Sequence, residues 1–180
     1  RMKQLENKIA IVTGGTRGIG FSTVEAFLQE GATVILCGSR PESAEKAVQA
    51  LKAQDPAAKV EGISPELSDY ASVKAAFDAV AEKYGRIDIL VNNAGMSDAT
   101  PFADYTPEQF QKVMDLNVNG MFNCTRAVTD HMAEQGSGVV LNTSSMVSIC
   151  GQPSGVGYPT SKFAVNGMTV SLARELGPKG

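Results

Sequence analysis

A tyrosine and a lysine stand four residues apart in the segment Tyr158-Pro159-Thr160-Ser161-Lys162. On a helix this spacing places both side chains on one face, with Cβ atoms about 5–6 Å apart. A free tyrosine has a pKa of ~10 and is a poor base at neutral pH, but a nearby ammonium and a helix N-terminus both favour the phenolate. Such a tyrosine could give or take a proton at a substrate oxygen. The pair alone is weak evidence, because a Tyr-x-x-x-Lys spacing is common.

Two serines could complete this chemistry from a neighbouring strand. Ser144 and Ser145 follow directly after a predicted strand, 138–143, and Asn92-Asn93-Ala94-Gly95 closes another, 87–91. The carboxyl ends of the strands in a doubly wound parallel sheet meet at one edge, where such sheets bind ligands. A serine hydroxyl at this edge could hydrogen-bond the reacting oxygen. Of the two serines, Ser144 is the better candidate for an ordinary turn residue.

A glycine-rich turn provides a candidate phosphate site. The segment Thr13-Gly14-Gly15-Thr16-Arg17-Gly18-Ile19-Gly20 joins a predicted strand, 8–13, to a predicted helix, 19–30. Glycines let the backbone approach a pyrophosphate closely, and the unpaired N–H groups at the start of the helix favour its charge. The spacing differs from the Gly-x-Gly-x-x-Gly fingerprint, so the position between strand and helix is the stronger indication.

The residues after the second strand, 33–37, bear on the choice of nucleotide. An NAD site usually places an acidic residue here to accept from the ribose hydroxyls. This sequence has Gly38-Ser39-Arg40 instead, and a guanidinium suits a 2′-phosphate. Arg17 could reach the same phosphate, whereas Arg40 could also be a solvated residue at a helix start. The segment therefore predicts NADP(H) in preference to NAD(H).

Short β-branched strands alternate with longer helical patterns, which is typical of an α/β doubly wound parallel sheet, a Rossmann fold. The right-handed crossover rule, together with the family resemblance described in the next paragraph, implies the strand order 3-2-1-4-5. The remaining predicted elements are a strand at 59–63 and helices at 41–54, 69–84, 106–134 with a bend near Asn117 to Gly120, and 158–176.

Taken together, TGGTRGIG, VNNAG, Asn117, the serine pair and YPTSK resemble, in order and spacing, the short-chain dehydrogenase/reductase family. The resemblance implies Ser145, Tyr158 and Lys162 as catalytic residues. It implies Asn117 as a fourth, whose side chain or local helix distortion holds a water that links Lys162 to solvent. The family usually has an aspartate where this sequence has Glu66. The resemblance implies cofactor contacts from Gly14, Thr16, Arg17, Gly18, Ile19, Gly20, Ser39, Arg40, Glu66, Leu67, Asn93, Ala94, Gly95, Tyr158 and Lys162.

The resemblance also implies the reaction, which is interconversion of a ketone and a secondary alcohol with a nicotinamide cofactor. The segments TRGIGF and Ser154 to Pro159 are similar to bacterial bile-acid hydroxysteroid dehydrogenases, and 3-oxoacyl-carrier-protein reductases are the alternative. A more distant alternative is a dinucleotide-binding regulator without catalysis. An apolar pocket is expected from Val147, Ile149, Cys150 and Val156.

Composition and family pattern set the expected partners. The net charge of −3 gives no indication of nucleic acid, and no apolar run reaches the ~20 residues of a membrane span. Three scattered cysteines predict free thiols in a reducing cytoplasm and no metal site. The family commonly forms homotetramers, for which Met121, Phe122, Met168 and Leu172 could supply apolar surface or could equally be core.

The family pattern continues beyond Gly180 with a sixth strand and a substrate lid. We therefore expect residues 1–180 to be a single NAD(P)-binding domain truncated before these parts, with the fifth strand left as an edge. Arg1-Met2 is interpreted as the remainder of a tag before a native methionine.

Overall fold

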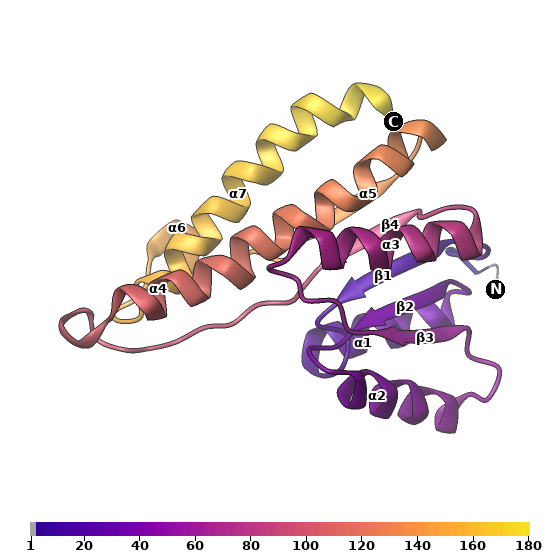
Figure 1. Cartoon of the computed structure of the whole chain (residues 1–180), viewed down its shortest axis with the longest axis horizontal. Helices are drawn as coiled ribbons and strands as arrows, with labels where there is room; N and C mark the ends of the chain where they lie inside the picture. The colour runs from indigo at the N-terminus through magenta and orange to yellow at the C-terminus, as the bar shows by residue number, and fades with distance from the viewer. Residues whose placement is uncertain (1–2) are drawn as a thin grey trace.

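The computed structural model describes residues 3–180, so the interpretation of Arg1-Met2 concerns residues outside the described part. Within it, five parallel strands form one sheet in the order β3-β2-β1-β4-β5, which is the order that the sequence predicts (Figure 1). The strands are β1 (Ile9–Thr13), β2 (Thr33–Cys37), β3 (Val60–Ile63), β4 (Ile89–Asn92) and β5 (Val139–Asn142).

Helices cover both faces of this sheet and leave a hydrophobic core on each. On one face lie α1 (Gly18–Gln29) and α2 (Pro41–Gln54), and on the other α3 (Tyr70–Tyr84) and α5 (Met121–Gln135) (Figure 1). All five residues of β1 are buried, and alternate ones enter the two cores: Ile11 packs with Phe77 of α3, Val12 with Val24 of α1. Burial on both sides explains why β1 is a continuous apolar run.

Local signals in the sequence set the helix ends. Asp69 Oδ1 accepts a hydrogen bond from the N–H of Ala71 at 3.0 Å and so caps α3, and Gly85 ends that helix in the left-handed conformation with φ 75°. At α4 (Pro107–Met114), Thr106 and Gln109 form the predicted capping box, with reciprocal side-chain to backbone bonds of 3.2 and 2.8 Å.

The long helix predicted over 106–134 is interrupted where the bend was expected. Between α4 and α5 the chain forms a π-helical turn, η2 (Asp115–Gly120), in which Asn117 and Gly120 are buried. A π-helical turn widens the helix locally and is frequent at functional sites. It places Asn117 in the interior, where its side chain contacts Met96 in the segment after β4.

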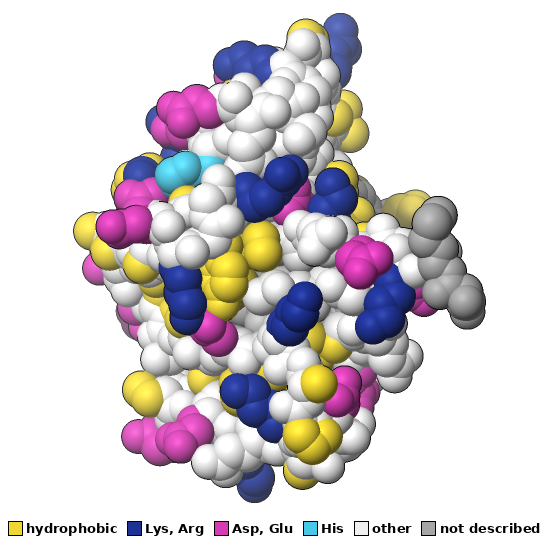
Figure 2. Space-filling view, turned by 90° about the vertical axis from the view of Figure 1, so that its right-hand side faces the viewer, with side chains coloured by type: hydrophobic (Ala, Val, Ile, Leu, Met, Phe, Trp, Pro, Cys, Tyr) yellow, Lys and Arg dark blue, Asp and Glu magenta, His cyan; other side chains and the backbone are white. Residues whose placement is uncertain are grey.

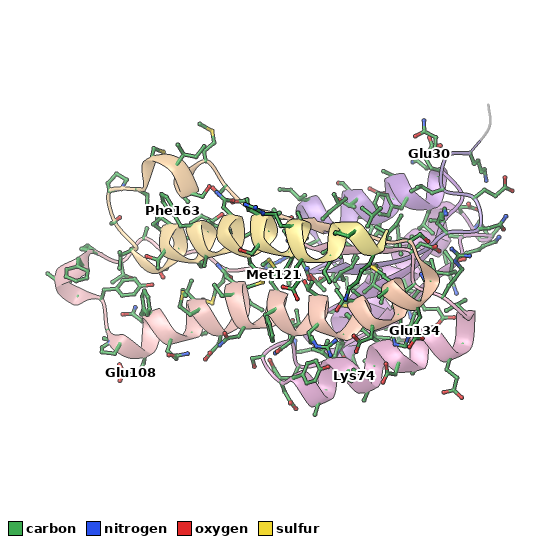
Figure 3. All side chains as sticks on the ribbon, turned by 90° about the horizontal axis from the view of Figure 1, so that it is seen from above. Glu30, Lys74, Glu108, Met121, Glu134 and Phe163 are labelled. Carbon is green, nitrogen blue, oxygen red and sulfur yellow. The ribbon has the colours of Figure 1, made fainter. Side chains whose placement is uncertain are left out.

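The last part of the chain carries three further elements. These are a four-residue helix that the sequence did not predict, α6 (Val147–Cys150), the long helix α7 (Gly157–Leu176) and a short 3-10 turn, η3 (Gly177–Lys179). Another 3-10 turn, η1 (Phe102–Asp104), precedes α4. Helices α5 and α7 run side by side and extend past the sheet toward α4 and α6 (Figures 1 and 3).

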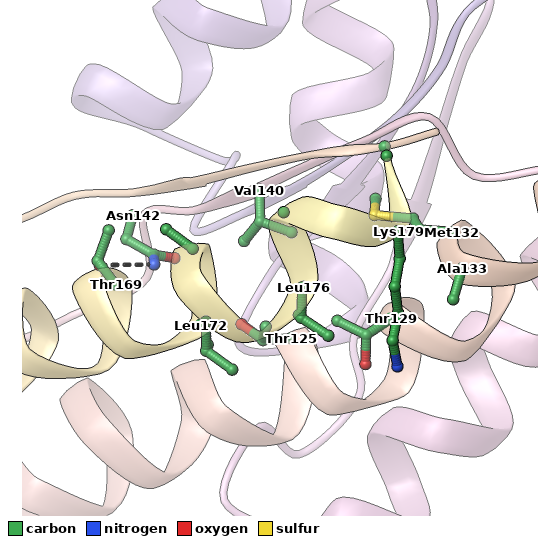
Figure 4. A pocket seen from close by; sticks show the side chains of 14 residues that line it. Thr125, Thr129, Met132, Ala133, Val140, Asn142, Thr169, Leu172, Leu176 and Lys179 are labelled. Carbon is green, nitrogen blue, oxygen red and sulfur yellow. Dashed lines mark hydrogen bonds between the residues drawn. The ribbon is translucent and has the colours of Figure 1, made fainter. Parts of the chain in front are cut away.

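Strand β5 forms the edge of the sheet within residues 3–180. Val139 and Leu141 are 50% and 49% exposed, whereas Val140 and Asn142 face α5 and α7. With Leu172 and neighbouring residues they line a cavity of about 220 Å³ (Figure 4). Acidic and basic side chains are interspersed over the face shown in Figure 2. The helices of residues 3–180 include none with the length and hydropathy to cross a membrane.

Candidate active site

Tyr158 and Lys162 lie together on the first turns of α7. Lys162 is only 5% exposed, and its Nζ lies 5.6 Å from the centre of the Tyr158 ring. The same Nζ donates a 2.7 Å hydrogen bond to the carbonyl oxygen of Thr143, directly after β5. Burial lowers the pKa of Lys162, because the charged form loses hydration there. Tyr158 thus has the Lys162 ammonium beside its ring and lies in the first turn of α7, at the N-terminal end of the helix.

The two serines after β5 differ in what their hydroxyls contact. Ser144 Oγ donates to Asn166 Oδ1 of α7 at 2.6 Å. Ser145 Oγ accepts a long, 3.4 Å hydrogen bond from the N–H of Val147 and donates to no group within residues 3–180. Ser145 is therefore the serine whose hydroxyl remains able to donate to a bound oxygen.

Asn117 uses its side chain to fix the chain after β4. Its Oδ1 accepts from the N–H of Met96 at 2.9 Å, and its Nδ2 donates to Met96 O at 2.8 Å and to Ser161 Oγ at 3.0 Å. Both amide hydrogens are therefore used. A Cβ on Gly95 would lie 3.3 Å from Asn117 Oδ1 and 3.9 Å from Lys162 Nζ, so Gly95 passes close beside this group.

The glycine-rich turn after β1 is fixed by the end of β4. Asn93 Nδ2 donates to the carbonyl oxygens of Thr13 and Gly14 at 3.2 and 3.3 Å. Thr13 Oγ1 accepts from the N–H groups of Asn93 and Ala94, both at 3.0 Å. A Cβ on Gly20 would lie 2.1 Å from Gly14 O, so this position requires glycine.

The outer side of this turn is open and fits a pyrophosphate. Gly18 has φ 55°, and a Cβ there would meet nothing within 4 Å. Ile19 is 73% exposed, and no side chain caps the N-terminus of α1. The N–H groups and positive dipole end of α1 are thus free for an anion. Thr16 and Arg17 flank the opening, so the residues present fit a dinucleotide.

Basic side chains gather near the end of β2. Arg17 and Lys46 help line a hollow of about 400 Å³ between α1 and α2, together with Thr16 and Ser43. Ser39 and Arg40 are exposed at the carboxyl end of β2, and Arg40 precedes the first turn of α2. In the described part of the chain, neither Arg17 nor Arg40 forms an ion pair. Both guanidinium groups are therefore available to an added anion.

The segment after β3 holds Glu66 by a local contact. Glu66 Oε1 accepts from both the N–H and the hydroxyl of Ser68, at 3.2 and 2.7 Å. Leu67 packs against the core on the α3 side, and its carbonyl oxygen accepts from Asn123 Nδ2 at 2.9 Å. Glu66 is exposed at this end of the sheet, where the resemblance implies an adenine contact.

A contact that the sequence did not predict braces the start of α7. Tyr105 donates a 2.7 Å hydrogen bond to Asp98 Oδ2, and a Cβ on Gly157 would lie 2.3 Å from the Tyr105 hydroxyl oxygen. Burial, together with the bond to Asp98, raises the pKa of Tyr105 to about 12. Gly155, with φ 75°, approaches the Asp98 carbonyl equally closely. The glycines in the segment before Tyr158 could have indicated from the sequence that another part of the chain approaches closely there.

The residues expected to form an apolar pocket lie around α6 but are open. Ile149 is 82% exposed and Val156 38%, Cys150 is also exposed, and Val147 is half-buried. Met146, which the sequence analysis did not select, is 81% exposed beside them. Together they form an apolar surface next to Ser145 and Tyr158.

Comparison with known proteins agrees with this geometry. A model of the short chain dehydrogenase family matches residues 8–180. The 3alpha-hydroxysteroid dehydrogenase of Mediterraneibacter gnavus is 60% identical over 173 residues, which are 96% of this chain and 69% of that protein. The 3-oxoacyl-[acyl-carrier-protein] reductase FabG of Thermotoga maritima is 38% identical over 173 residues, 96% of this chain and 70% of that protein.

Solved structures show the same likeness. The crystal structure of NAD+-bound xylitol dehydrogenase superposes with a TM-score of 0.93 at 31% identity, covering 99% of this chain and 68% of that chain.

Proposed function

This chain belongs to the short chain dehydrogenase family of NAD(P)-dependent oxidoreductases, and we propose that it interconverts a keto and a hydroxyl group on a steroid, with NADP(H) as the preferred cofactor. The observation that carries the proposal is the arrangement of Tyr158, Lys162 and the free hydroxyl of Ser145 at the carboxyl edge of the sheet.

In the reducing direction, Ser145 Oγ and the Tyr158 hydroxyl donate hydrogen bonds to the substrate carbonyl oxygen. A nicotinamide cofactor held by the glycine-rich turn and the end of β4 would supply the hydride that the carbonyl carbon accepts. Tyr158 gives its proton to the oxygen as negative charge develops there, and the Lys162 ammonium stabilises the phenolate that remains. In the oxidising direction the phenolate takes the proton back. Gly95, beside Asn117 and Lys162, would contact the bound cofactor.

The preference for NADP(H) is supported by charge at the end of β2. Arg17 and Arg40 have no carboxylate partner within residues 3–180, and Lys46 lies in the same hollow as Arg17. A 2′-phosphate carries up to two negative charges and is matched by guanidinium hydrogen-bond donors. The position where an NAD site would carry a carboxylate has Ser39 instead.

A steroid substrate is supported by the comparison and by the surface beside the catalytic residues. Identity to the hydroxysteroid dehydrogenase is 60%, against 38% to the acyl-carrier-protein reductase. Met146, Ile149 and Val156 offer a wide apolar surface next to Ser145. The burial of a rigid hydrocarbon skeleton there would favour binding.

The test is NADPH oxidation by the complete protein with a panel of steroid ketones and a β-ketoacyl thioester. We expect turnover of a 3-keto steroid with kcat/KM at least tenfold above that of the thioester. A preference for the thioester would contradict the steroid proposal, and turnover of neither class would contradict the proposed function as a whole.

We also propose that two copies or more associate through α5 and α7. On these helices Phe122, Phe163 and Val170 are 51%, 51% and 62% exposed, whereas Met121 belongs to the protein's own interior. Light scattering of the complete protein tests this, with Phe122→Glu expected to lower the measured mass. A wild-type monomer at all concentrations would contradict it.

A further inference from the structure

A third polar residue continues the face of α7 that carries Tyr158 and Lys162. Asn166 follows Lys162 by four residues, as Lys162 follows Tyr158, so the three lie on one face of the helix. Tyr158 and Lys162 are the proposed catalytic pair. The third contacts the segment that holds Ser145.

Asn166 hydrogen-bonds a serine on each side of Ser145. Its Oδ1 accepts from Ser144 Oγ at 2.6 Å, and its Nδ2 donates to Ser148 Oγ at 2.9 Å. Ser148 is 5% exposed, and its hydroxyl donates a 2.6 Å hydrogen bond to the carbonyl oxygen of Ser145. Since Ser148 can then only accept from Asn166, the amide nitrogen must face it, and the amide orientation is fixed.

The result is a serine with a fixed backbone and a free hydroxyl. The carbonyl oxygen of Ser145 accepts both the hydroxyl and the N–H of Ser148, the latter at 3.0 Å. Its Oγ, in contrast, has only the long contact from Val147 N–H among the described residues. A donor aimed at a reacting oxygen is effective when its position is set before substrate binds.

We propose that Asn166 is a positioning residue, which fixes Ser145 relative to Tyr158 by tying both flanks of Ser145 to the helix that carries Tyr158. This proposal rests on the proposed function, in that Ser145 is taken to donate to the substrate oxygen. It adds a residue whose effect on the reaction passes through Ser145.

Helix α7 has a further polar tie, to β5 itself, which separates positioning from simple stability. Asn142 Nδ2 of β5 donates to Thr169 Oγ1 at 2.9 Å, away from Ser145 (Figure 4). Thr169→Val removes this tie and is a matched control, because it loosens α7 from β5 without touching the flanks of Ser145.

The experiment measures kcat for ketone reduction, the Kd for NADPH and thermal unfolding in the complete protein. Asn166→Leu should lower kcat at least about tenfold, with the Kd for NADPH within about twofold of wild type. Asn166→Asp should also lower kcat, because Ser148 would turn its hydroxyl hydrogen to the carboxylate and release Ser145 O; this variant replaces Asn166→Leu if the latter fails to fold. Thr169→Val should keep at least half of the wild-type kcat.

The decisive comparison adds Ser145→Ala. If Asn166 acts through Ser145, adding Asn166→Leu to the Ser145→Ala protein should lower kcat by less than about threefold, because the effects of coupled residues are not additive. The proposal would be overturned if Asn166→Leu lowered kcat a full tenfold in both the wild-type and the Ser145→Ala protein. It would also be overturned if the Asn166→Leu protein kept more than half of the wild-type kcat. Full activity of Ser145→Ala would instead count against the proposed function.

Discussion

The Lys162 ammonium lies 5.6 Å from the centre of the Tyr158 ring and takes its hydrogen-bond acceptor from the backbone, at Thr143 O. No carboxylate pairs with it among residues 3–180. A buried cation without a counter-ion costs stability, and burial accordingly lowers the pKa of Lys162. The lysine that we propose to be catalytic thus lowers the stability of the fold, which is a frequent compromise in enzymes.

This predicts that Lys162→Met raises the melting temperature at pH 7 while it abolishes turnover. Methionine fills a similar volume and removes the charge, at the loss of one hydrogen bond. Calorimetry of both proteins is the measurement, and a melting temperature several degrees below wild type would contradict the prediction.

The same gain should depend on pH. The folded-state pKa of Lys162 is lowered, so above it the unfolded chain binds more protons than the folded one, and wild-type stability rises with pH. The cost is fully present below the lowered pKa and is relieved as pH rises from there toward the ordinary value of 10.5. The stability advantage of Lys162→Met over wild type should therefore shrink as pH rises through this range. An advantage that grew with pH would contradict the prediction.

Cofactor choice is tested by Arg40→Asp. Loss of a charge-assisted phosphate contact costs about 1.5–3 kcal/mol, so the Kd for NADPH should rise by more than tenfold while that for NADH changes far less. Arg174→Asp, the same exchange on α7 at the far side of the molecule from α2 (Figure 1), is the control. Equal weakening of both cofactors by Arg40→Asp would remove the basis for the NADP(H) preference.

A buried carboxylate at the other end of β4 should matter for folding rather than chemistry. Asp88 Oδ2 accepts from the N–H of Ile9 at 2.9 Å, and both carboxylate oxygens accept from Arg86 Nε at 2.9 and 3.0 Å. Asp88→Asn places an amide against these donors and should lower the free energy of unfolding by about 2–3 kcal/mol.

The control for this variant is Asp130→Asn, which breaks an exposed pair with Arg126 and should lower the free energy of unfolding far less, because exposed ion pairs contribute little. Urea unfolding measures both changes. Comparable losses from Asp88→Asn and Asp130→Asn would show that burial at Asp88 adds nothing.

The sequence was sufficient where the signal is local. Three features were predicted from residues that are close together in the sequence. They are the turn after β1, the capping box of Thr106 and Gln109, and the end of α3 at Gly85. The bend at Asn117 could be placed because the predicted helix was too long for a straight one. The order of the strands followed from the right-handed crossover rule, which applies to any such chain, and from the pattern of the family that the sequence resembles.

Other features depended on contacts between distant segments. Helix α6 has four residues, too few for a periodic pattern. The contact of Tyr105 with Gly157 and that of Asn166 with the flanks of Ser145 join segments that only the folded chain brings together. Likewise, Met121 and Phe122 are adjacent and equally apolar, yet Met121 is buried and Phe122 is 51% exposed. Which of the two side chains is buried depends on which side of α5 packs against the sheet.

The most direct test of the account is the effect of Tyr158→Phe on NADPH consumption with a steroid ketone in the complete protein. Phenylalanine keeps the ring beside Lys162 and removes only the hydroxyl that is proposed to move the proton. We expect turnover to fall by at least about a thousandfold, with the Kd for NADPH nearly unchanged. Retention of a tenth or more of the wild-type turnover would show that Tyr158 is not the acid and base of this reaction.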